Sequence, residues 1–289
     1  MVIDFIKMSG AGNDFVLIDN RDTGLSVDWS KAAPEICDRH YGIGADGLLV
    51  LTRHEKDDFA MAYYNADGSS GSMCGNGGRC AAYFYLEGTH QQSVHFYSNG
   101  YTYSGSITSA GEVRVQMKDP GPIRKDIGMD VLGHRLRLHF IDTGSPHAVI
   151  FTDDLPEQLK KEIEGKMFFD IAKAIRHSPE FMPGGVNVNF IRIRNNRGLS
   201  MRTYERGVED ETLACGTGSI ACAIVAHAVK GIQSPVDVQT RGNERLEVSF
   251  DSVDGKFSNV SLGGPAKVIF KGQYSLKTNI LSTESNRKI

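Results

Sequence analysis

The chain of 289 residues lacks a long hydrophobic run and carries no strong excess of charge of either sign. No window approaches the ~20 apolar residues of a membrane-spanning helix. The start Met1–Phe5 also lacks the basic region and apolar core of a signal peptide. The formal net charge of −3 argues against the basic face of a nucleic-acid binder. We expect a cytoplasmic globular protein whose partner is a small molecule, with no nucleic acid and no membrane.

A disulfide framework and a zinc site are also excluded. The five cysteines are an odd number, and they include no Cys-x2-Cys pair and no close Cys/His cluster. We interpret Cys37, Cys80 and Cys222 as small buried side chains. No metal ligand set is predicted.

A dinucleotide-binding loop is absent although its spacing is present. Gly42 to Gly47 fits G-x-G-x-x-G, but that fingerprint requires a strand before it and a helix after it. Here a helical pattern precedes the glycines and the strand-like run Leu48–Leu51 follows them. We interpret the segment as a turn.

One sequence motif, a cysteine followed by a glycine-rich turn, occurs twice in the chain. Cys74-Gly75-Asn76-Gly77 and Cys215-Gly216-Thr217-Gly218 each place a cysteine before a glycine turn that leads into small residues. An almost wholly apolar helix is predicted after each turn, over Arg79–Leu86 and Ile220–Val229, and such helices belong in the centre of a core. Two copies indicate two similar halves that each deliver one thiol.

The remaining pattern alternates strands and helices in the same order in both halves. Helices are also predicted over Lys31–Arg39, Glu157–Ile163 and Ile171–Ile175. Strands are predicted over Val2–Lys7, Phe15–Asp19, Leu48–Leu51, Phe59–Tyr64, Val94–Tyr97, Val113–Met117, Leu136–Ile141, Ala148–Phe151, Asn187–Ile193, Ser200–Tyr204, Val236–Gln239, Leu246–Phe250, Val260–Leu262 and Lys267–Phe270. A polar tail follows the last strand.

Two breaker clusters divide the chain. They are the segment 119–122, Asp-Pro-Gly-Pro, and the segment 263–265, Gly-Gly-Pro. We predict a mixed α/β (α+β) fold of two pseudo-symmetric domains. The first comprises residues 1–119 and 265–289 and carries Cys74; the second comprises 120–264 and carries Cys215. Clefts between domains are common sites for small ligands.

The two cysteine turns suit acid/base chemistry. A free thiol with a pKa of about 8.5 is mostly protonated at neutral pH, but the N–H groups and dipole of a helix N-terminus favour the thiolate. The same N–H groups bind carboxylates. Two sulfurs on opposite sides of one carbon could remove and return a proton and so invert a stereocentre. The alternative, a pair of ordinary buried cysteines, explains one copy better than two.

Two ionisable residues are candidates for tuning these thiols. His147 follows Pro146 at the head of a predicted strand, and Glu205 precedes Cys215 by ten residues. A nearby imidazole or carboxylate would shift a thiol pKa. The alternative is a surface histidine and an exposed glutamate. Glu205 and Arg206 also match Asn65 in the internal repeat.

Several segments together resemble one family, the diaminopimelate epimerases. They occur in the family's order and span almost the whole chain: Lys7–Phe15, Tyr41–Gly47, Asn65–Ser69, Met73–Cys80, Tyr204–Gly207 and Cys215–Gly218. The resemblance implies an isomerase that interconverts LL- and meso-2,6-diaminopimelate in lysine and peptidoglycan biosynthesis. It implies no cofactor, neither pyridoxal phosphate nor metal, and a possible homodimer. The implied fold has two domains, each a sheet wrapped around a central helix.

The resemblance also implies roles for individual residues. Cys74 and Cys215 become the two acid/base groups, tuned by His147 and Glu205. Backbone amides of Gly75, Asn76, Gly216 and Thr217 would hold the reacting carboxylate. The amino groups and the distal end would be bound by Asn13, Asn65, Asn187, Glu205 and Arg206. Ser145 stands where many members carry a substrate-contacting asparagine, and Gly47 stands where some carry glutamine; a serine hydroxyl can still bind, with a shorter reach.

Three alternatives remain open from the sequence. Another cofactor-independent racemase on the same scaffold, of proline or histidine type, would keep both thiols and change the polar rim. A dithiol redox sensor would use the same cysteines to form a disulfide. A binding module without chemistry would leave the paired thiols unexplained.

Overall fold

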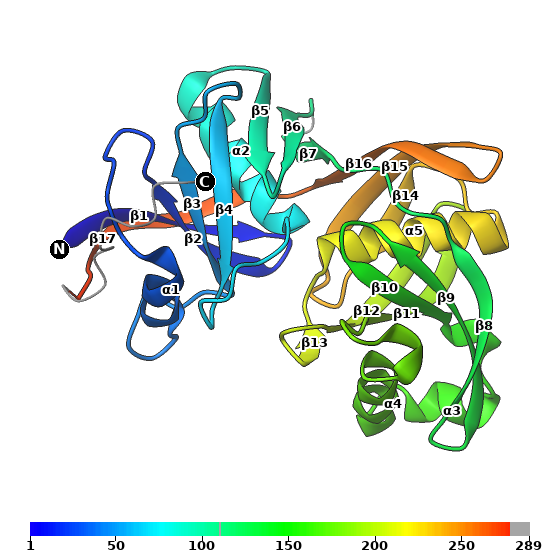
Figure 1. The fold of residues 1–289 in the computed structure, drawn as a ribbon. Helices are drawn as coiled ribbons and strands as arrows, with labels where there is room; N and C mark the ends of the chain where they lie inside the picture. The colour runs from blue at the N-terminus through cyan, green and yellow to red at the C-terminus, as the bar shows by residue number, and fades with distance from the viewer. Residues whose placement is uncertain (110, 278–289) are drawn as a thin grey trace. The chain divides into compact units, whose positions relative to one another are not determined.

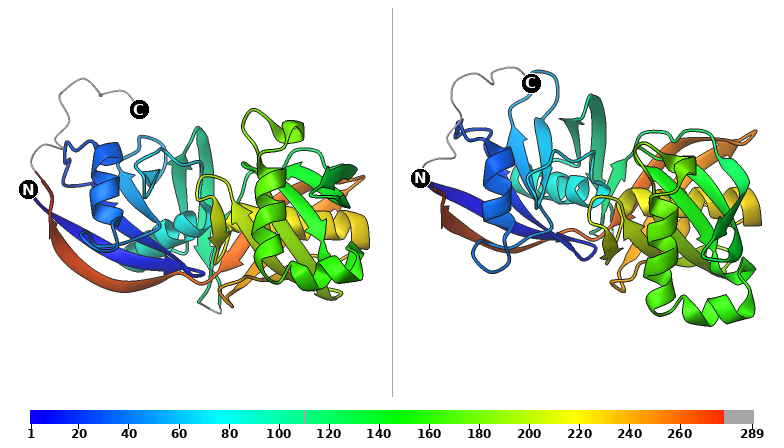
Figure 2. Two further views of the ribbon diagram at one scale, coloured as in Figure 1. Left: turned by 90° about the horizontal axis from the view of Figure 1, so that it is seen from below. Right: turned by 60° about the horizontal axis from the view of Figure 1, so that its bottom comes forward.

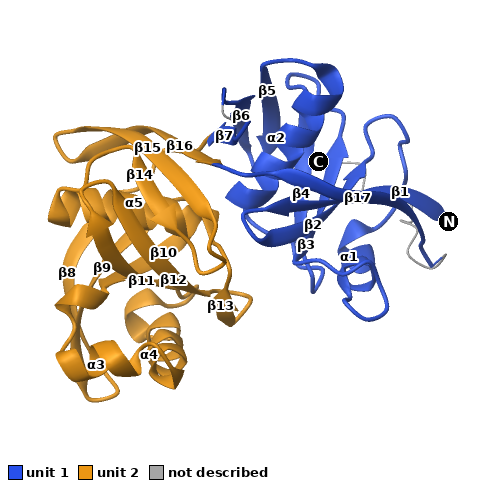
Figure 3. Cartoon of the chain, turned by 180° about the vertical axis from the view of Figure 1, so that it is seen from behind, with its two compact units in different colours: residues 1–115, 264–289 blue, residues 116–263 orange. Residues whose placement is uncertain are grey.

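The computed structural model describes residues 1–109 and 111–277, and the chain forms two compact units (Figures 1 and 3). The first unit contains residues 1–115 and the chain from residue 264 onwards, and the second contains residues 116–263. The first unit is therefore discontinuous in sequence. The chain leaves it close to the Asp-Pro-Gly-Pro segment at 119–122 and returns to it at Gly264.

The first unit is built on one sheet with two helices. Strand β17 pairs antiparallel with β1 and runs beside it (Figure 2), and β1 pairs antiparallel with β2. The order continues with β3 parallel to β2, β4 antiparallel to β3, β5 parallel to β4, and β6 antiparallel to β5. The elements are β1 (Val2–Gly10), β2 (Asn13–Asp19), α1 (Trp29–Cys37), β3 (Gly47–Thr52), β4 (Phe59–Asn65), α2 (Gly75–Thr89), β5 (Ser93–Ser98), β6 (Tyr101–Ile107), β7 (Val113–Gln116) and β17 (Lys267–Ser275).

The second unit repeats this plan. Strand β8 pairs antiparallel with β9, and β9 with β10. Then β11 is parallel to β10, β12 antiparallel to β11, β14 parallel to β12, and β15 antiparallel to β14. The elements are β8 (Arg124–Val131), β9 (His134–Asp142), β10 (Pro146–Phe151), η1 (Thr152–Asp154), α3 (Glu157–Glu162), α4 (Lys166–Arg176), η2 (Pro179–Phe181), β11 (Asn187–Asn195), β12 (Gly198–Glu205), β13 (Asp210–Thr212), α5 (Gly216–Lys230), β14 (Val236–Gln239), β15 (Arg245–Val253) and β16 (Lys256–Gly264).

The two units share one sequence of strand directions. From β17 to β6 and from β8 to β15, the neighbouring pairs run antiparallel, antiparallel, parallel, antiparallel, parallel, antiparallel. In each unit the helix that follows the cysteine turn connects the fifth strand of the set to the sixth. The predicted pseudo-symmetric fold is confirmed.

A buried helix lies inside each sheet. Helix α2 packs against β1 to β6 and β17, and α5 packs against β9 to β12, β14 and β15. Ten residues of α5, Gly216 and Gly218–Ala226, are buried, so this part of the helix has almost no polar face. The absence of a solvent-facing stripe is the pattern of a helix surrounded by core. The prediction of sheets wrapped around central apolar helices is correct.

A second helix layer covers the other side of each sheet. In the first unit, α1 contributes Trp29 and Ile36 to a cluster with Val16, Leu48 and Val50 of the sheet. In the second unit, α3 and α4 contribute Leu159, Phe168, Ile171 and Ile175 to a cluster with β8 to β12. Residues alternate between faces along a strand, so β2 and β3 supply both layers. The sheets are therefore buried on two sides.

Several element boundaries differ from the predicted ones. Helices α2 and α5 begin at Gly75 and Gly216, directly after the cysteines, whereas the predicted helices began at Arg79 and Ile220. Glycine is unfavourable within a helix, but these glycines stand in the first turn, where the N–H groups have no intrahelical partner. Helix α1 spans Trp29–Cys37 rather than Lys31–Arg39 because the Ile36 and Cys37 carbonyls turn to accept N–H groups from residues 43–45.

Three strands were not predicted. They are β6, β8 and β13, whose sequences are rich in polar residues; apolar residues alternate in β6 and in the second half of β8, and this signal was missed. Pairing with β5, β9 and β12 supplies the order that local sequence does not. Strand β17 also continues to Ser275, beyond the predicted end at Phe270, because β1 pairs with it along its length. The predicted polar tail lies largely outside the described residues.

Candidate active site

Cys74 is the N-cap of α2 in the first unit. Its backbone is extended (φ −90°, ψ 113°) and its Sγ accepts a hydrogen bond from the Gly77 N–H at 3.4 Å. The thiol is partly exposed, while Gly75 and Asn76 behind it are buried. A Cβ at Gly78 would lie 2.3 Å from Met73 Cε, so glycine lets the Met73 side chain pack directly against the helix. The first turn of α2 therefore holds the sulfur beside unpaired backbone N–H groups.

A buried guanidinium lies behind this turn. Arg79 has no exposed surface, and its Nη2 donates to Asn76 Oδ1 at 2.8 Å and its Nη1 to the Gly75 carbonyl at 3.4 Å. Burial lowers the pKa of Arg79 to about 10, with the thiols of Cys80 and Cys74 acting in the opposite direction. A guanidinium with that pKa remains charged at neutral pH. The predicted apolar helix thus contains one fixed positive charge near the Cys74 turn.

Asn76 connects this charge to the predicted substrate residue Asn13. Asn76 Nδ2 donates to Asn13 Oδ1 at 2.5 Å, and Asn13 Nδ2 donates to Asp46 Oδ2 at 3.0 Å. Both ends of the Asn76 amide are therefore used within the protein. The side chain of Asn76 is a support, and the backbone N–H is the group left for a ligand.

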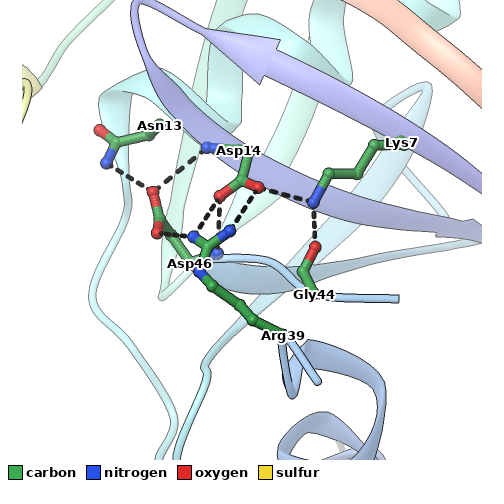
Figure 4. A network of polar contacts seen from close by, with 6 residues as sticks. All are labelled: Lys7, Asn13, Asp14, Arg39, Gly44 and Asp46. Carbon is green, nitrogen blue, oxygen red and sulfur yellow. Dashed lines mark hydrogen bonds and ion pairs between the residues drawn. The ribbon is translucent and has the colours of Figure 1, made fainter. Parts of the chain in front are cut away.

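A charged network anchors Asn13 (Figure 4). The Lys7 ammonium, 9% exposed, pairs with Asp14 at 2.7 Å and also donates to the Gly44 carbonyl. Arg39 bridges Asp14 at 2.8 Å and Asp46 at 2.6 Å. Burial raises the pKa of Asp14, but the hydrogen bonds from Arg39 and Lys7 outweigh burial and lower the pKa to about 2. The predicted turn is confirmed for residues 42–46, whereas Gly47 already belongs to β3, and this network ties the turn to the β1–β2 turn.

Asn65 lies at the end of β4, at the same edge of the sheet. Phe15 pairs with Gly47 and Gly47 pairs with Asn65 across three adjacent strands. The Asn65 side chain is half-buried and its Nδ2 donates to Ser69 Oγ at 2.9 Å. Asn13 begins β2 two residues before Phe15. The first unit thus gathers Cys74, Asn76, Asn13 and Asn65 around one sheet edge and one helix end.

Cys215 is the N-cap of α5 in the second unit. Its backbone is extended (φ −132°, ψ 114°), and the residue is 6% exposed. Its Sγ lies 3.7 Å from Thr217 Oγ1, a hydroxyl in the first turn of the helix. Within the described part of the chain, the Cys215 side chain makes no capping bond to a first-turn N–H, unlike Cys74. The two thiols therefore have different hydrogen-bond environments.

His147 is completely buried and does not lie on the surface. Its Nε2 is 3.0 Å from Thr217 Oγ1 and its Nδ1 is 3.1 Å from Asn189 Nδ2. Burial, assisted by the positive charge of Arg206, lowers the pKa of His147 to about 3. The imidazole is therefore neutral at physiological pH. The Thr217 hydroxyl contacts both the imidazole and the Cys215 sulfur, so it links the two groups.

Asn187, Ser145, Glu205 and Arg206 occur together at one edge of the second sheet. Asn187 is buried, and its Nδ2 donates to Ser145 Oγ and to the Pro146 carbonyl, each at 2.9 Å. Its Oδ1 accepts the Arg206 N–H at 2.9 Å. Glu205 is half-exposed at the end of β12 and its Oε2 accepts the Thr212 hydroxyl at 2.9 Å.

The strand registers make these two edges equivalent. His147 pairs with Asn187 on β10 and β11, as Phe15 pairs with Gly47 on β2 and β3. Val188 pairs with Tyr204, so Asn187 and Glu205 are the adjacent positions, as Gly47 and Asn65 are in the first unit. The internal repeat therefore relates Asn65 to Glu205 and Asn13 to Ser145.

Three supporting residues were not predicted as part of the site: Arg79, Asn189 and Thr203. Arg79 stands alone as a charge in an otherwise apolar helix pattern, which is a detectable signal. Asn189 follows Asn187 by two residues in a strand, so period two puts both amides on one face. Thr203 gives no such signal, since threonine is common in strands.

The other three cysteines are core residues, as predicted. Cys37, Cys80 and Cys222 are at most 3% exposed. Burial raises the pKa of the Cys37 and Cys80 thiols to about 12, and raises that of Cys222 further. A thiol in that state is neither a nucleophile nor a base at neutral pH. In the described residues, no helix is both long and apolar enough to cross a membrane.

Comparison with known proteins shows the family of this chain. The sequence model described as "Diaminopimelate epimerase" matches residues 5–128 and 139–268. A diaminopimelate epimerase from Chlorobaculum tepidum is 42% identical over 273 residues, covering 93% of this chain and 100% of that protein. One from Aquifex aeolicus is 37% identical over 287 residues, covering 94% and 98%.

Solved structures of low sequence identity share the fold. A PhzF-family phenazine biosynthesis protein from Bacillus anthracis aligns with a TM-score of 0.70 at 12% identity, covering 96% of this chain and 100% of that chain. A probable proline racemase from Agrobacterium radiobacter aligns with a TM-score of 0.68 at 15% identity, covering 95% and 93%. These similarities establish the architecture, and the sequence relatives establish the family.

Proposed function

Because the chain belongs to the diaminopimelate epimerase family, whose members are isomerases, we propose that it inverts one α-carbon of 2,6-diaminopimelate with Cys74 and Cys215. The observation that carries this proposal is the repeated helix cap. Each sulfur stands at the N-terminus of a buried helix, beside glycines whose N–H groups have no intrahelical partner. The reaction would require no group besides side chains and backbone amides.

The helix ends would bind the reacting carboxylate. The N–H groups of Gly75 and Asn76 in the first unit and of Gly216 and Thr217 in the second are first-turn donors. Such donors attract anions through hydrogen bonds and the helix dipole. They would also stabilise the negative charge that develops on the substrate when its α-proton leaves. Arg79 adds a fixed positive charge behind the Gly75–Asn76 pair.

The proton transfers balance without an external acid. One cysteine thiolate removes the α-proton and becomes a thiol, and the electron pair of the C–H bond is delocalised into the carboxylate. The second cysteine thiol then delivers its proton to the opposite face of the carbon and becomes a thiolate. The two sulfurs have exchanged protonation states, so the reverse reaction uses the same groups in exchanged roles.

The distal end of the substrate would be bound by the polar sheet edges. Asn65 and Asn187 offer amides, Glu205 a carboxylate for an ammonium group, and Arg206 a guanidinium for a carboxylate. Ser145 replaces an amide with a hydroxyl that already accepts from Asn187. Asn13 is tied to Asn76 and Asp46 and retains one Nδ2 hydrogen for a ligand. A second amino-acid end suits this set better than the ring of proline.

Isotope exchange tests the proposal. In deuterated water, LL-diaminopimelate should gain deuterium at one α-carbon while the meso form appears. Proline, hydroxyproline and histidine should show no comparable exchange. Exchange of proline alone would assign the chain to the rival racemase activity on this fold, and exchange of none of these compounds would remove the enzyme proposal.

Cysteine variants test the two-thiol scheme. Cys74→Ala and Cys215→Ala should each lose at least about 10³-fold in kcat, because general acid–base groups contribute 10²–10⁴-fold each. Cys80→Ala is the matched control, since its thiol is buried and stays protonated, and it should retain turnover. Near-normal turnover in Cys74→Ala or Cys215→Ala would refute the scheme. A redox sensor would instead give no epimerisation in the reduced wild type.

A further inference from the structure

The Cys215 sulfur stands at the end of a chain of hydrogen-bonded polar groups, of which Asn189 and His147 are fully buried and Thr217 is partly buried. Asn189 is completely buried between β10 and β12, and its Nδ2 lies 3.0 Å from the Ala148 carbonyl and 3.1 Å from His147 Nδ1. Its Oδ1 accepts the Thr203 hydroxyl at 2.9 Å. Exchanging N and O of this amide would oppose two carbonyl oxygens, so only one orientation satisfies every partner.

This orientation determines the tautomer of His147. Asn189 Nδ2 donates, so His147 Nδ1 must accept and carries no proton. The imidazole is neutral, hence its proton is on Nε2 and is donated to Thr217 Oγ1 at 3.0 Å. With a lone pair of Oγ1 occupied, the hydroxyl hydrogen of Thr217 is available to the Cys215 Sγ at 3.7 Å.

The packing around Asn189 supports a specific arrangement. A Cβ on Gly218 would lie 2.8 Å from Asn189 Oδ1 and 3.2 Å from Cys215 Sγ. Glycine at this position therefore lets a buried amide, a helix turn and a sulfur approach one another. The equivalent position beside Cys74 differs, because there the sulfur accepts a backbone N–H from Gly77.

We propose that Asn189, His147 and Thr217 form a one-way hydrogen-bond chain that ends at Cys215 and favours its thiolate in the substrate-free protein. Asn189 acts as a positioning residue, since it fixes the direction of the chain without reaching the reacting atoms. A hydrogen bond donated to a charged group is stronger than one to a neutral group, so a donor aimed at the sulfur favours its anion. Cys74 receives its own donor, the Gly77 backbone N–H at 3.4 Å, so the two sulfurs are supported by different kinds of donor. The catalytic use of the chain to Cys215 rests on the proposed function.

Thiol alkylation across pH 5–9, read by mass spectrometry of the Cys215 and Cys74 peptides, tests the chain. Thr217→Val keeps the backbone N–H and removes the hydroxyl, and it should raise the midpoint for Cys215 by about one pH unit. Thr217→Ser keeps the hydroxyl and should leave the midpoint unchanged. The Cys74 midpoint is the internal control and should not move. A Cys215 midpoint in Thr217→Val within about 0.3 of wild type would overturn the proposal.

Nitrogen-15 NMR of labelled histidine tests the direction independently. His147 should appear as a neutral ring with its proton on Nε2 from pH 5 to 8. Asn189→Ala should yield a mixture of tautomers and a smaller upward shift of the Cys215 midpoint. A proton on Nδ1 in the wild type would overturn the chain. Neither measurement depends on turnover. A protein without epimerase activity but with the expected spectra would therefore refute the proposed function and leave the hydrogen-bond chain supported.

Discussion

Asn76→Ala should destabilise the first unit far more than an ordinary asparagine substitution. The change removes the acceptor of the Arg79 Nη2 bond at 2.8 Å and the donor to Asn13 Oδ1 at 2.5 Å, both inside the protein. Losing a bond to a buried charge costs about 1.5–3 kcal/mol, and losing a neutral bond costs about 1 kcal/mol. We expect the free energy of unfolding to fall by about 3 kcal/mol.

The chain provides a selective probe for this measurement. Its one tryptophan, Trp29, is 8% exposed on α1 and belongs to the core of the first unit. Urea unfolding followed by tryptophan fluorescence therefore reports on the unit that contains Asn76. With a slope of about 2 kcal/mol per molar urea, the midpoint should fall by about 1.5 M. Asn65→Ala, at a half-exposed amide bonded to Ser69, is the control and should shift the midpoint by less than about 0.5 M.

A double-mutant cycle identifies the cause. Arg79→Met replaces the buried charge with an apolar chain, so in the Asn76→Ala background it should restore part of the lost stability rather than add a loss. The coupling should be about 1–2 kcal/mol. Additive losses, or a single-variant loss below about 0.5 kcal/mol, would refute the idea that Asn76 compensates Arg79.

Three further predictions concern the rest of the site. Between pH 7 and pH 5 the wild-type second unit should lose about 2 kcal/mol of stability, because burial lowers the pKa of folded His147 to about 3 and the unfolded histidine takes up the proton first. His147→Gln should remove this pH-dependent loss, and amide exchange of β10 measures it. Asp14→Asn should lower the stability by about 3 kcal/mol at pH 7, because it leaves the Lys7 charge uncompensated. In the wild type this contribution persists at pH 4 and disappears as the pH falls through about 2. An unfolding midpoint, followed by Trp29 fluorescence, that does not change over this pH range would contradict the prediction. Epimerisation should survive chelators and carbonyl-trapping reagents, since sulfur and backbone amides carry the proposed chemistry; inhibition by either reagent would point to a bound group.

The sequence was sufficient to predict the architecture because the repeat is written in local patterns. Two cysteine–glycine turns, each followed by an apolar helix, specify the central helices, and alternating strands specify the sheets around them. Strand β8 was not predicted, because it begins with polar residues and owes its order to its pairing with β9. A strand that owes its order to its partner is hard to identify from its own residues alone.

The supporting groups of the site could be predicted only in part. The repeated motif identifies Cys74 and Cys215 from the sequence alone, but the partners of His147 depend on which strands become neighbours. Asn189 reaches His147 because β10 and β11 are parallel with His147 opposite Asn187. Likewise, Asn76 was expected to bind the substrate through its backbone N–H. Its side chain has a separate role, since its Oδ1 accepts a hydrogen bond from the buried Arg79. Burial and register, rather than residue type, decide these roles.

The discontinuity of the first unit has a consequence for the nascent chain. Strand β1 is among the first segments to leave the ribosome, but its partner β17 follows only after the 148 residues 116–263 of the second unit. At about 5–20 residues per second, translation of that insertion takes roughly 7–30 s. During this interval β1 presents an open edge, which is a template for wrong pairing. The second unit is contiguous, so it can complete its sheet while the first still waits for its last strand.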